Sequence, residues 1–325
     1  MASKYKVALQ VVFFCISLVV ANSVHFNYPA VFNFGDSNSD TGEFAAAKGF
    51  QSAPPNGQNY FKTPSGRFCD GRLIVDFLMD AMDLPFLNAY LDSLGLPNFH
   101  QGCNYATAGS TTLPANAASI SPFGFGSQVS QFLLFKARVL ELLALAGKKF
   151  DEYVPAEDYF EKGLYMFDIG QNDLAGTFYS KDLDQILSLI PTILLEFETG
   201  IKRLYDNGAR NFWIHNTGPL GCLGQKGQYQ DVNVTYVDIF TIKSNLIANY
   251  SKHGFEQPIM ACCGYGGPPL NFDSRVSCGL TKILSNGTTI TAKGCNDSSV
   301  YVNWDGTHYT EAANQYVASQ ILTRN

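Results

Sequence analysis

A serine, a histidine and an aspartate stand in polar turns near the two ends of the chain. Ser37 occurs in Gly35-Asp36-Ser37, directly after a short apolar run. A serine hydroxyl is a weak nucleophile and needs a base within hydrogen-bond reach. His308, in Trp304-Asp305-Gly306-Thr307-His308, is a candidate base, and Asp305 can hold its Nδ1–H while Nε2 faces the nucleophile. This combination favours acyl transfer, although each motif alone is equally typical of a solvated turn.

Two further turns supply candidate donors for an oxyanion. Gly109 offers a backbone N–H that no side chain blocks, and Asn172 offers a side-chain amide just after an apolar run. With the N–H of Ser37 they would form a three-donor oxyanion hole, each donor contributing on the order of 3 kcal/mol to transition-state binding. The structural alternative is a tight bend at Gly109 and a turn that closes a strand at Asn172. No G-x-S-x-G occurs in the chain, so the nucleophile elbow of the α/β-hydrolases is absent.

The elements that must position these residues alternate between strand and helix. Continuous apolar runs predict buried strands over 28–35, 163–170, 209–216 and 232–239. Apolar residues at three- and four-residue spacing predict helices over 127–146 and 183–205, and Thr310 can cap a last helix to Leu322. Such alternation indicates a parallel sheet covered on both faces, whose active site lies beyond the carboxyl ends of the strands. His215, at one such end, either approaches the site or is a buried histidine with satisfied hydrogen bonds.

Length and composition limit the class of protein. The chain has 325 residues, of which 46% are hydrophobic and 15% charged, which argues against a disordered or fibrous protein. A net charge of −6 without long runs of like charge argues against nucleic-acid binding, which needs a basic face. The aromatic residues, 14% of the chain, are numerous enough to line a sugar or acyl pocket.

The N-terminus is typical of a signal peptide. Lys4 and Lys6 precede an apolar run over 7–20, and the small residues Ala21 and Ser23 suit a cleavage site. The run is shorter than a bilayer span, so we expect a signal peptide over about 1–23, secretion and no stable membrane insertion; a signal anchor is the alternative. Four N-x-S/T sequons are candidate glycosylation sites, at Asn233, Asn249, Asn286 and Asn296.

Four of the eight cysteines gather in the last quarter of the chain: Cys262, Cys263, Cys278 and Cys295. This is expected of disulfides in an oxidising compartment. Zinc binding is the alternative, but adjacent cysteines without a CxxC pair or a flanking histidine have poor ligand spacing. We therefore expect disulfides and no metal. Loss of Cys15 with the signal peptide leaves an odd number of cysteines.

Four sequence blocks occur in order: Phe34-Gly35-Asp36-Ser37-Asn38-Ser39-Asp40-Thr41-Gly42, Asn104-Tyr105-Ala106-Thr107-Ala108-Gly109, Gly170-Gln171-Asn172-Asp173 and Asp305-Gly306-Thr307-His308. Together with residues 64–72 they resemble the GDSL esterase/lipase family, the plant branch of the SGNH hydrolases. The match runs from about residue 28 to the C-terminus. Gln171 and residues 311–314 look most like the early-nodulin-8-like subgroup.

The resemblance implies a single domain over 24–325, with a three-layer α/β/α, flavodoxin-like fold and a central parallel sheet of about five strands. It implies Ser37 as nucleophile, His308 as base and Asp305 as its orienting residue, with Gly109 and Asn172 completing the oxyanion hole. The reaction would be hydrolysis of short-chain acyl or acetyl esters, small-molecule or carbohydrate, through an acyl-enzyme and without a cofactor. A catalytically silent secreted glycoprotein and an acyltransferase are the alternatives, and the oligomeric state is open.

The sequence departs from the family pattern at three places. Gln171 replaces the second glycine of Gly-Gly-Asn-Asp, and Asn38 stands where leucine is commoner. After Cys222, where family members carry several dozen residues with a cysteine and a long helix, only residues 223–231 precede the next predicted strand. We therefore expect a missing helix near 223–231, an uncovered apolar strand face and an unpaired Cys222.

Overall fold

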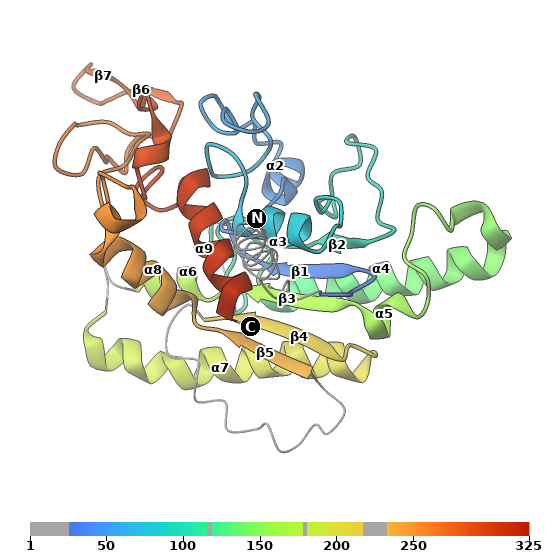
Figure 1. Cartoon of the computed structure of the whole chain (residues 1–325). Helices are drawn as coiled ribbons and strands as arrows, with labels where there is room; N and C mark the ends of the chain where they lie inside the picture. The colour runs from blue at the N-terminus through green and yellow to red at the C-terminus, as the bar shows by residue number, and fades with distance from the viewer. Residues whose placement is uncertain (1–25, 116–118, 178–180, 217–232, 325) are drawn as a thin grey trace, which may run out of the picture.

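The central element of the fold is a parallel sheet of five strands. A computed structural model describes residues 26–115, 119–177, 181–216 and 233–324. Within them the strand order is β2-β1-β3-β4-β5, and all neighbours run parallel (Figure 1). The strands are β1 (Val31–Gly35), β2 (Gly102–Asn104), β3 (Leu164–Asp168), β4 (Asn211–His215) and β5 (Asn233–Val237). The predicted fold class is confirmed.

Helices lie on both faces of this sheet and complete the three layers (Figure 1). They are α2 (Glu43–Lys48), α3 (Ile74–Ala81), α4 (Phe125–Ala146), α5 (Tyr159–Lys162), α6 (Gln171–Ala175), α7 (Leu183–Asp206), α8 (Ile239–Ala248) and α9 (Glu311–Arg324). A small antiparallel hairpin, β6 (Thr281–Ile283) and β7 (Thr289–Thr291), stands apart from the main sheet. Among the described residues, no helix is both long and apolar enough to cross a bilayer.

Strand side chains alternate between two hydrophobic cores, one on each face of the sheet. Val31 and Trp213 pack with α3, α8 and α9 on one face. Phe32 and Phe212, each one position away, pack with α4 and α7 on the other. Because β1 and β3 are buried along their whole length on both faces, their sequences are continuous apolar runs.

The predicted helices are observed within a few residues of their expected ends. They correspond to α4, α7 and α9. Thr310 caps α9 as predicted, since its Oγ1 accepts a hydrogen bond from the N–H of Ala313 at 3.2 Å. Asn207 is the C-cap of α7.

Two strands differ from the sequence-based expectation. β2 has three residues and was not located in advance, because its last residue opens a block that reads as a turn. β5 was predicted to be buried, but it is an edge strand: Val234 and Tyr236 are 44% and 41% exposed. Among the described residues only β4 pairs with it.

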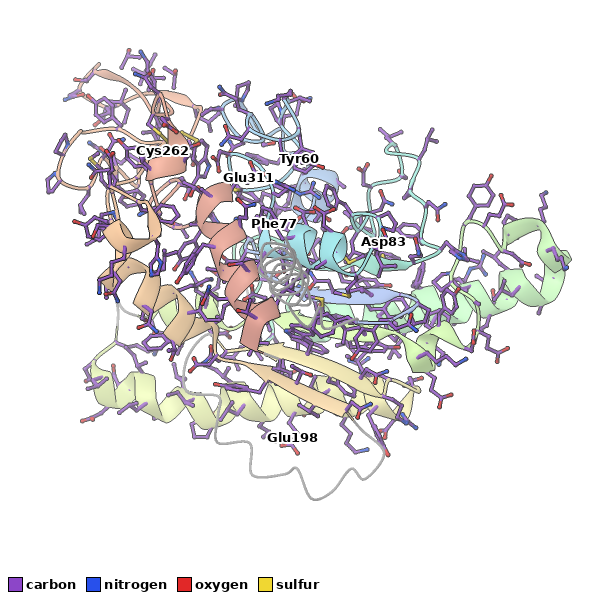
Figure 2. The ribbon with its side chains drawn as sticks, viewed as in Figure 1. Tyr60, Phe77, Asp83, Glu198, Cys262 and Glu311 are labelled. Atoms are coloured by element: carbon purple, nitrogen blue, oxygen red, sulfur yellow. A yellow bond between two sulfur atoms is a disulfide. The ribbon has the colours of Figure 1, made fainter. Side chains whose placement is uncertain are left out.

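The clustered cysteines form disulfides, as predicted, and the pairs, which the sequence left open, are Cys262–Cys295 and Cys263–Cys278. Figure 2 shows Cys262 in the C-terminal lobe that also carries the β6–β7 hairpin. Because all four sulfur atoms are bonded in pairs, the zinc alternative is wrong. Cys69 and Cys103 are buried and not disulfide-bonded. Cys222, and the missing helix expected near 223–231, lie outside the described residues.

These assignments predict the thiol content of the mature protein. In the denatured, non-reduced chain we expect three reactive thiols, from Cys69, Cys103 and Cys222, measured with a chromogenic disulfide reagent. Before denaturation, Cys69 and Cys103 should not react, because both are buried and burial raises the pKa of each thiol. A single thiol after denaturation would contradict the pairing described here.

Candidate active site

The polar turns identified in the sequence meet at the carboxyl edge of the sheet. β1 leads into residues 36–40, β2 into residues 105–109 and β3 into residues 169–173. The register pairs Gly35 with Asp168, and the N–H of Asp36 donates to the Asp168 carbonyl at 3.2 Å. Strands β2, β1 and β3 are neighbours, so their three following turns lie side by side.

Asp305 and His308 form a direct pair in the turn before α9. Nδ1 of His308 lies 2.7 Å from Oδ2 of Asp305. The other carboxylate oxygen accepts hydrogen bonds from the N–H groups of Thr307 at 3.0 Å and His308 at 2.9 Å. This arrangement fixes the orientation of the imidazole ring. The other ring nitrogen, Nε2, is buried and has no hydrogen-bond partner among the described residues.

The charges around His308 favour its protonated form. Burial by itself lowers the pKa of His308, but the Asp305 carboxylate and the more distant Asp36 outweigh burial, so the pKa lies above its ordinary value. For Asp305, burial raises the pKa, while His308 and two backbone N–H groups hold it below the ordinary value. An imidazolium formed at His308 is therefore stabilised by a carboxylate that stays ionised.

Ser37 follows Asp36 at the end of β1 and is 8% exposed. No hydrogen bond joins Ser37 to His308, but Asp36, the residue before Ser37, contributes to the raised pKa of His308. Catalytic hydrogen bonds are often long without substrate, so this geometry does not remove Ser37 as a candidate. Burial and the nearby Asp168 raise the pKa of Asp36 to about 7, although Asn38 donates to it twice.

The three candidate oxyanion donors occupy the turns after β1, β2 and β3. Among the described residues the N–H groups of Ser37 and Gly109 have no acceptor. Gly109 has a φ of 77°, a conformation that favours glycine, and a Cβ there would approach the Ile120 side chain to 2.9 Å. The Asn172 amide donates one hydrogen to the carbonyl of Ser110 at 2.8 Å and has a second hydrogen that no described residue accepts.

Asp40 joins the first block to the second. One oxygen of its carboxylate accepts the N–H groups of Gly42 and Glu43, at 2.8 and 2.7 Å. The other accepts those of Phe44 at 3.2 Å and Ala108 at 2.7 Å. Burial raises the pKa of Asp40 to about 6 even though four N–H groups stabilise the carboxylate. The sequence placed Asp40 in a block but gave it no role.

Asn104 and Asp173 make the remaining connections between the blocks. The Asn104 amide donates to the carbonyl of Ser39 at 2.7 Å and to Oγ1 of Thr41 at 2.8 Å. Its oxygen accepts from Asn33 at 2.8 Å and from an N–H of its own block at 3.0 Å. Asp173 accepts the N–H groups of residues 112 and 113 at 2.7 and 2.9 Å. Each side chain fixes a turn that carries a candidate catalytic group.

The two residues that depart from the family pattern lie together. The Asn38 amide donates to Oδ1 of Asp36 at 3.0 Å and to Oε1 of Gln171 at 3.4 Å. Both departures therefore join the turn of Ser37 to the turn of Asn172, and Asn172 itself is unaffected.

His215 is buried at the end of β4, but its hydrogen bonds are not satisfied as one of the two readings expected. Its Nδ1 lies 3.7 Å from Oδ2 of Asp168, and neither ring nitrogen has a hydrogen-bond partner among the described residues. Burial raises the pKa of Asp168, but His215 and Lys243 hold it below its ordinary value. His215 thus lies next to the carboxylate of Asp168, the last residue of β3.

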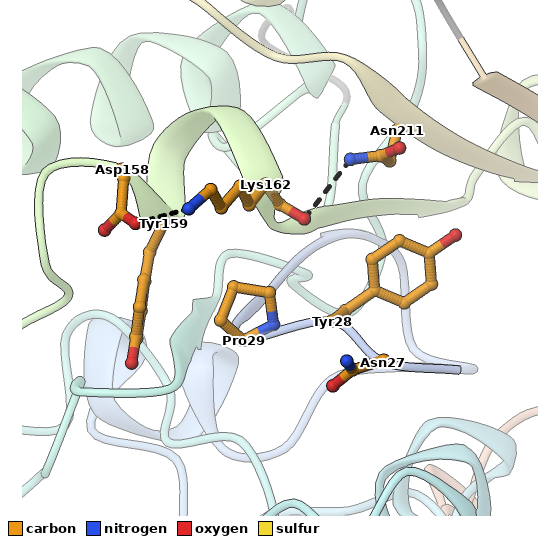
Figure 3. A pocket seen from close by; sticks show the side chains of 7 residues that line it. All are labelled: Asn27, Tyr28, Pro29, Asp158, Tyr159, Lys162 and Asn211. Carbon is orange, nitrogen blue, oxygen red and sulfur yellow. Dashed lines mark hydrogen bonds and ion pairs between the residues drawn. The ribbon is translucent and has the colours of Figure 1, made fainter. Parts of the chain in front are cut away.

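A pocket at the opposite edge of the sheet is separate from this site. It is lined by Asn27, Tyr28, Pro29, Asp158, Tyr159, Lys162 and Asn211 (Figure 3). These residues precede β1 and β3 or begin β4, so they stand at the amino ends of the strands. Lys162 is paired with Asp158 at 2.8 Å, which leaves no uncompensated charge between them.

The sequence matches known proteins over nearly its whole length. A family model described as GDSL-like Lipase/Acylhydrolase matches residues 31–321. The chain belongs to this family. A GDSL esterase/lipase of Arabidopsis thaliana is 56% identical, covering 99% of this chain and 94% of the relative. A Hevea brasiliensis protein named Esterase is 42% identical (91% and 86% covered), and the Medicago truncatula GDSL esterase/lipase ENOD8 is 41% identical (98% and 92% covered).

The alignment with this Arabidopsis GDSL protein is longer than the chain itself. It extends over 386 residues, whereas the chain has 325. The Arabidopsis protein therefore contains residues that have no counterpart in this GDSL family member.

The hydrogen bonds of the Asn104 side chain predict that replacing it with aspartate lowers the stability of the protein by an amount that depends on pH. In Asn104→Asp the new carboxylate cannot donate to Ser39 and Thr41, so on the order of 3 kcal/mol should be lost from the free energy of unfolding. A buried aspartate has a raised pKa, so the loss should be larger at pH 8 than at pH 5. Urea unfolding at both pH values measures it.

The matched control is Asn286→Asp, and all three proteins are made in a bacterial periplasm, which forms disulfides without adding a sugar at the Asn286 sequon. Asn286 is exposed, and its side chain only accepts, from the N–H of Thr288 at 3.0 Å, which an aspartate also does. We expect it to leave stability within about 0.5 kcal/mol of the parent. Equal stability of both variants at both pH values would show that the amide donors of Asn104 are dispensable.

Proposed function

We propose that this protein is a carboxylic ester hydrolase with Ser37 as nucleophile, His308 as general base and Asp305 as the residue that orients His308. The observation that carries the proposal is the Asp305–His308 pair at 2.7 Å, with a buried and unpartnered Nε2 whose pKa responds to the residue before Ser37. Membership of the lipase/acylhydrolase family and relatives named as esterases support the same chemistry.

The reaction would proceed through an acyl-enzyme. Oγ of Ser37 attacks the ester carbonyl carbon while its proton passes to Nε2 of His308. The oxygen of the tetrahedral intermediate is held by the N–H groups of Ser37 and Gly109 and the free amide hydrogen of Asn172. His308 then protonates the departing alcohol, and a water molecule activated by the same histidine releases the acid. Short-chain acyl or acetyl esters are the proposed substrates.

We further propose that the protein is secreted and glycosylated. Two disulfides support an oxidising compartment. Three of the four sequon asparagines are exposed and Asn249 is partly exposed, so each is open to modification. The proposed single domain over 24–325 lacks a segment after Cys222; the 386-residue alignment and the exposure of Val234 and Tyr236 support this.

The first experiment compares the parent with Ser37→Ala on p-nitrophenyl acetate and butyrate. We expect the variant to fall to background, because it lacks the attacking oxygen. Ser39→Ala is the matched control: it removes a hydroxyl from the same turn, and Oγ of Ser39 has no hydrogen-bond partner among the described residues. All three proteins must first show a cooperative thermal transition.

The outcomes of this comparison differ clearly. A folded parent and a folded Ser37→Ala variant that both stay at background would overturn the proposal and favour the catalytically silent scaffold. Equal activity above background in both proteins would also overturn it and would assign the reaction to another nucleophile. Ester formation with an added alcohol, in preference to hydrolysis, would identify an acyltransferase instead.

The electrostatics of His308 predict the acidic limb of the activity profile. His308 acts as a base only when neutral, and its pKa is raised above 6.5, so kcat/KM should fall as the pH drops through a midpoint above 6.5. Asp305→Asn removes the carboxylate that raises this pKa, so the midpoint should move to lower pH and kcat should fall by roughly a thousandfold or more.

The profile is measured as kcat/KM from pH 5 to pH 9. Asp36 has a pKa of about 7 and titrates in the same range, so Asp36→Asn serves as a comparison. It should move the midpoint in the same direction by less, because Asp36 is the weaker influence on His308. If Asp305→Asn leaves the midpoint unchanged, the fall of kcat/KM at low pH is not caused by protonation of His308.

A further inference from the structure

Three partly exposed phenylalanines form a continuous aromatic surface beside the candidate site. Phe44 lies on α2, Phe50 follows that helix and Phe68 belongs to the loop before α3. The ring centroids of Phe44 lie 5.6 Å from Phe50 and 6.1 Å from Phe68. Phe50 and Phe68 are stacked, with centroids 6.1 Å apart. We call these residues the Phe44–Phe50–Phe68 cluster.

The cluster touches the candidate base. The ring centroid of Phe68 lies 5.3 Å from that of His308, with a 31° angle between the planes. Partly exposed apolar side chains that pack together beside a site can contact a ligand bound there. Here the cluster adjoins the one ring in the proposed mechanism that must exchange protons with substrate.

Neighbouring contacts hold Phe68 in place on both sides. Arg67 forms a buried ion pair with Asp76 at 2.7 Å. Asp70 accepts the N–H of Glu311, at the start of α9, at 2.6 Å. Figure 2 shows Glu311 at this end of α9, and its carboxylate is also paired with Arg72 at 2.7 Å. The loop is thereby fixed to the helix that follows His308, so the aromatic surface is preorganised.

The position of the cluster relative to the mechanism indicates which part of an ester it contacts. His308 must reach the oxygen of the leaving alcohol in order to protonate it, so the alcohol lies beside the histidine ring. The oxyanion donor Gly109 is bordered instead by Ile120, an aliphatic side chain that is 71% exposed. The aromatic surface is therefore on the alcohol side of the site.

We propose that the Phe44–Phe50–Phe68 cluster is a binding subsite for the alcohol part of the ester, and that it selects alcohols with a flat aromatic ring. The proposal rests on the proposed ester hydrolysis and names the substrate class of the same site. Aromatic rings pack favourably in stacked and edge-to-face arrangements, and both arrangements already occur within the cluster.

The test compares two esters that share the acetyl group, benzyl acetate and ethyl acetate. Both release alcohols of similar acidity and form the same acyl-enzyme, so the ratio of their kcat/KM values reports the alcohol subsite. We expect Phe68→Ala to lower this ratio about tenfold. The matched control is Phe99→Ala: Phe99 is also partly exposed, but it packs with Phe135 on α4, and its loss should leave the ratio unchanged.

Each outcome decides the proposal. An unchanged ratio of benzyl acetate to ethyl acetate in folded Phe68→Ala would overturn the proposal. If the variant instead changes only the ratio of ethyl phenylacetate to ethyl acetate, the cluster is an acyl subsite, and the proposal is overturned as well. If Phe68→Ala lacks a cooperative thermal transition, Phe44→Ala takes its place. If the parent hydrolyses no ester, the proposed function fails, and the subsite is tested by NMR binding of benzyl alcohol: weaker binding to the variant supports it, and equal binding overturns it.

Discussion

The carboxylate of Asp40 is the interaction on which the geometry of this site depends. It accepts N–H groups from the first turn of α2 and from Ala108, so the loops after β1 and β2 are held by one buried side chain. Asn104 strengthens the connection between the same two loops, and Asp173 connects the loop after β2 to the turn after β3. Loops normally carry unsatisfied backbone groups to the surface. Here buried side chains satisfy them, so the turns that carry Ser37 and the oxyanion donors can be well ordered.

The sheet and its main helices were predictable because their patterns are local. β1 and β3 are buried on both faces and read as continuous apolar runs, and α4 and α7 carry apolar residues at helical spacing over many turns. β2 was not located because three residues do not establish a period. β5 was read as buried because its composition resembles that of the central strands, and composition does not report whether a strand has one neighbour or two.

The candidate site, like the fold, has residues whose roles could be predicted from the sequence and residues whose roles could not. Ser37, Asp305 and His308 could be selected from the sequence because their chemistry is carried by residue type and short spacing. The roles of Asp40, Asn104 and Asp173 could not, since their partners are backbone groups some sixty residues away. His215 illustrates the limit: the sequence places it at a strand end, but only the register of β3 and β4 brings it to Asp168. Contacts of this kind join residues that are far apart in the sequence, so a pattern of neighbouring residues does not predict them.

The exposed edge at β5 has a consequence for handling the protein. Among the described residues no strand pairs with the outer edge of β5, where Val234 and Tyr236 are accessible, and an unpaired strand edge is a template for association between copies. Asn233, the first residue of that strand, is exposed and lies in a sequon. An oligosaccharide there would act as a steric shield along the edge. If Asn233 carries the proposed sugar, protein made in a host that adds none would lack this shield and would aggregate more readily.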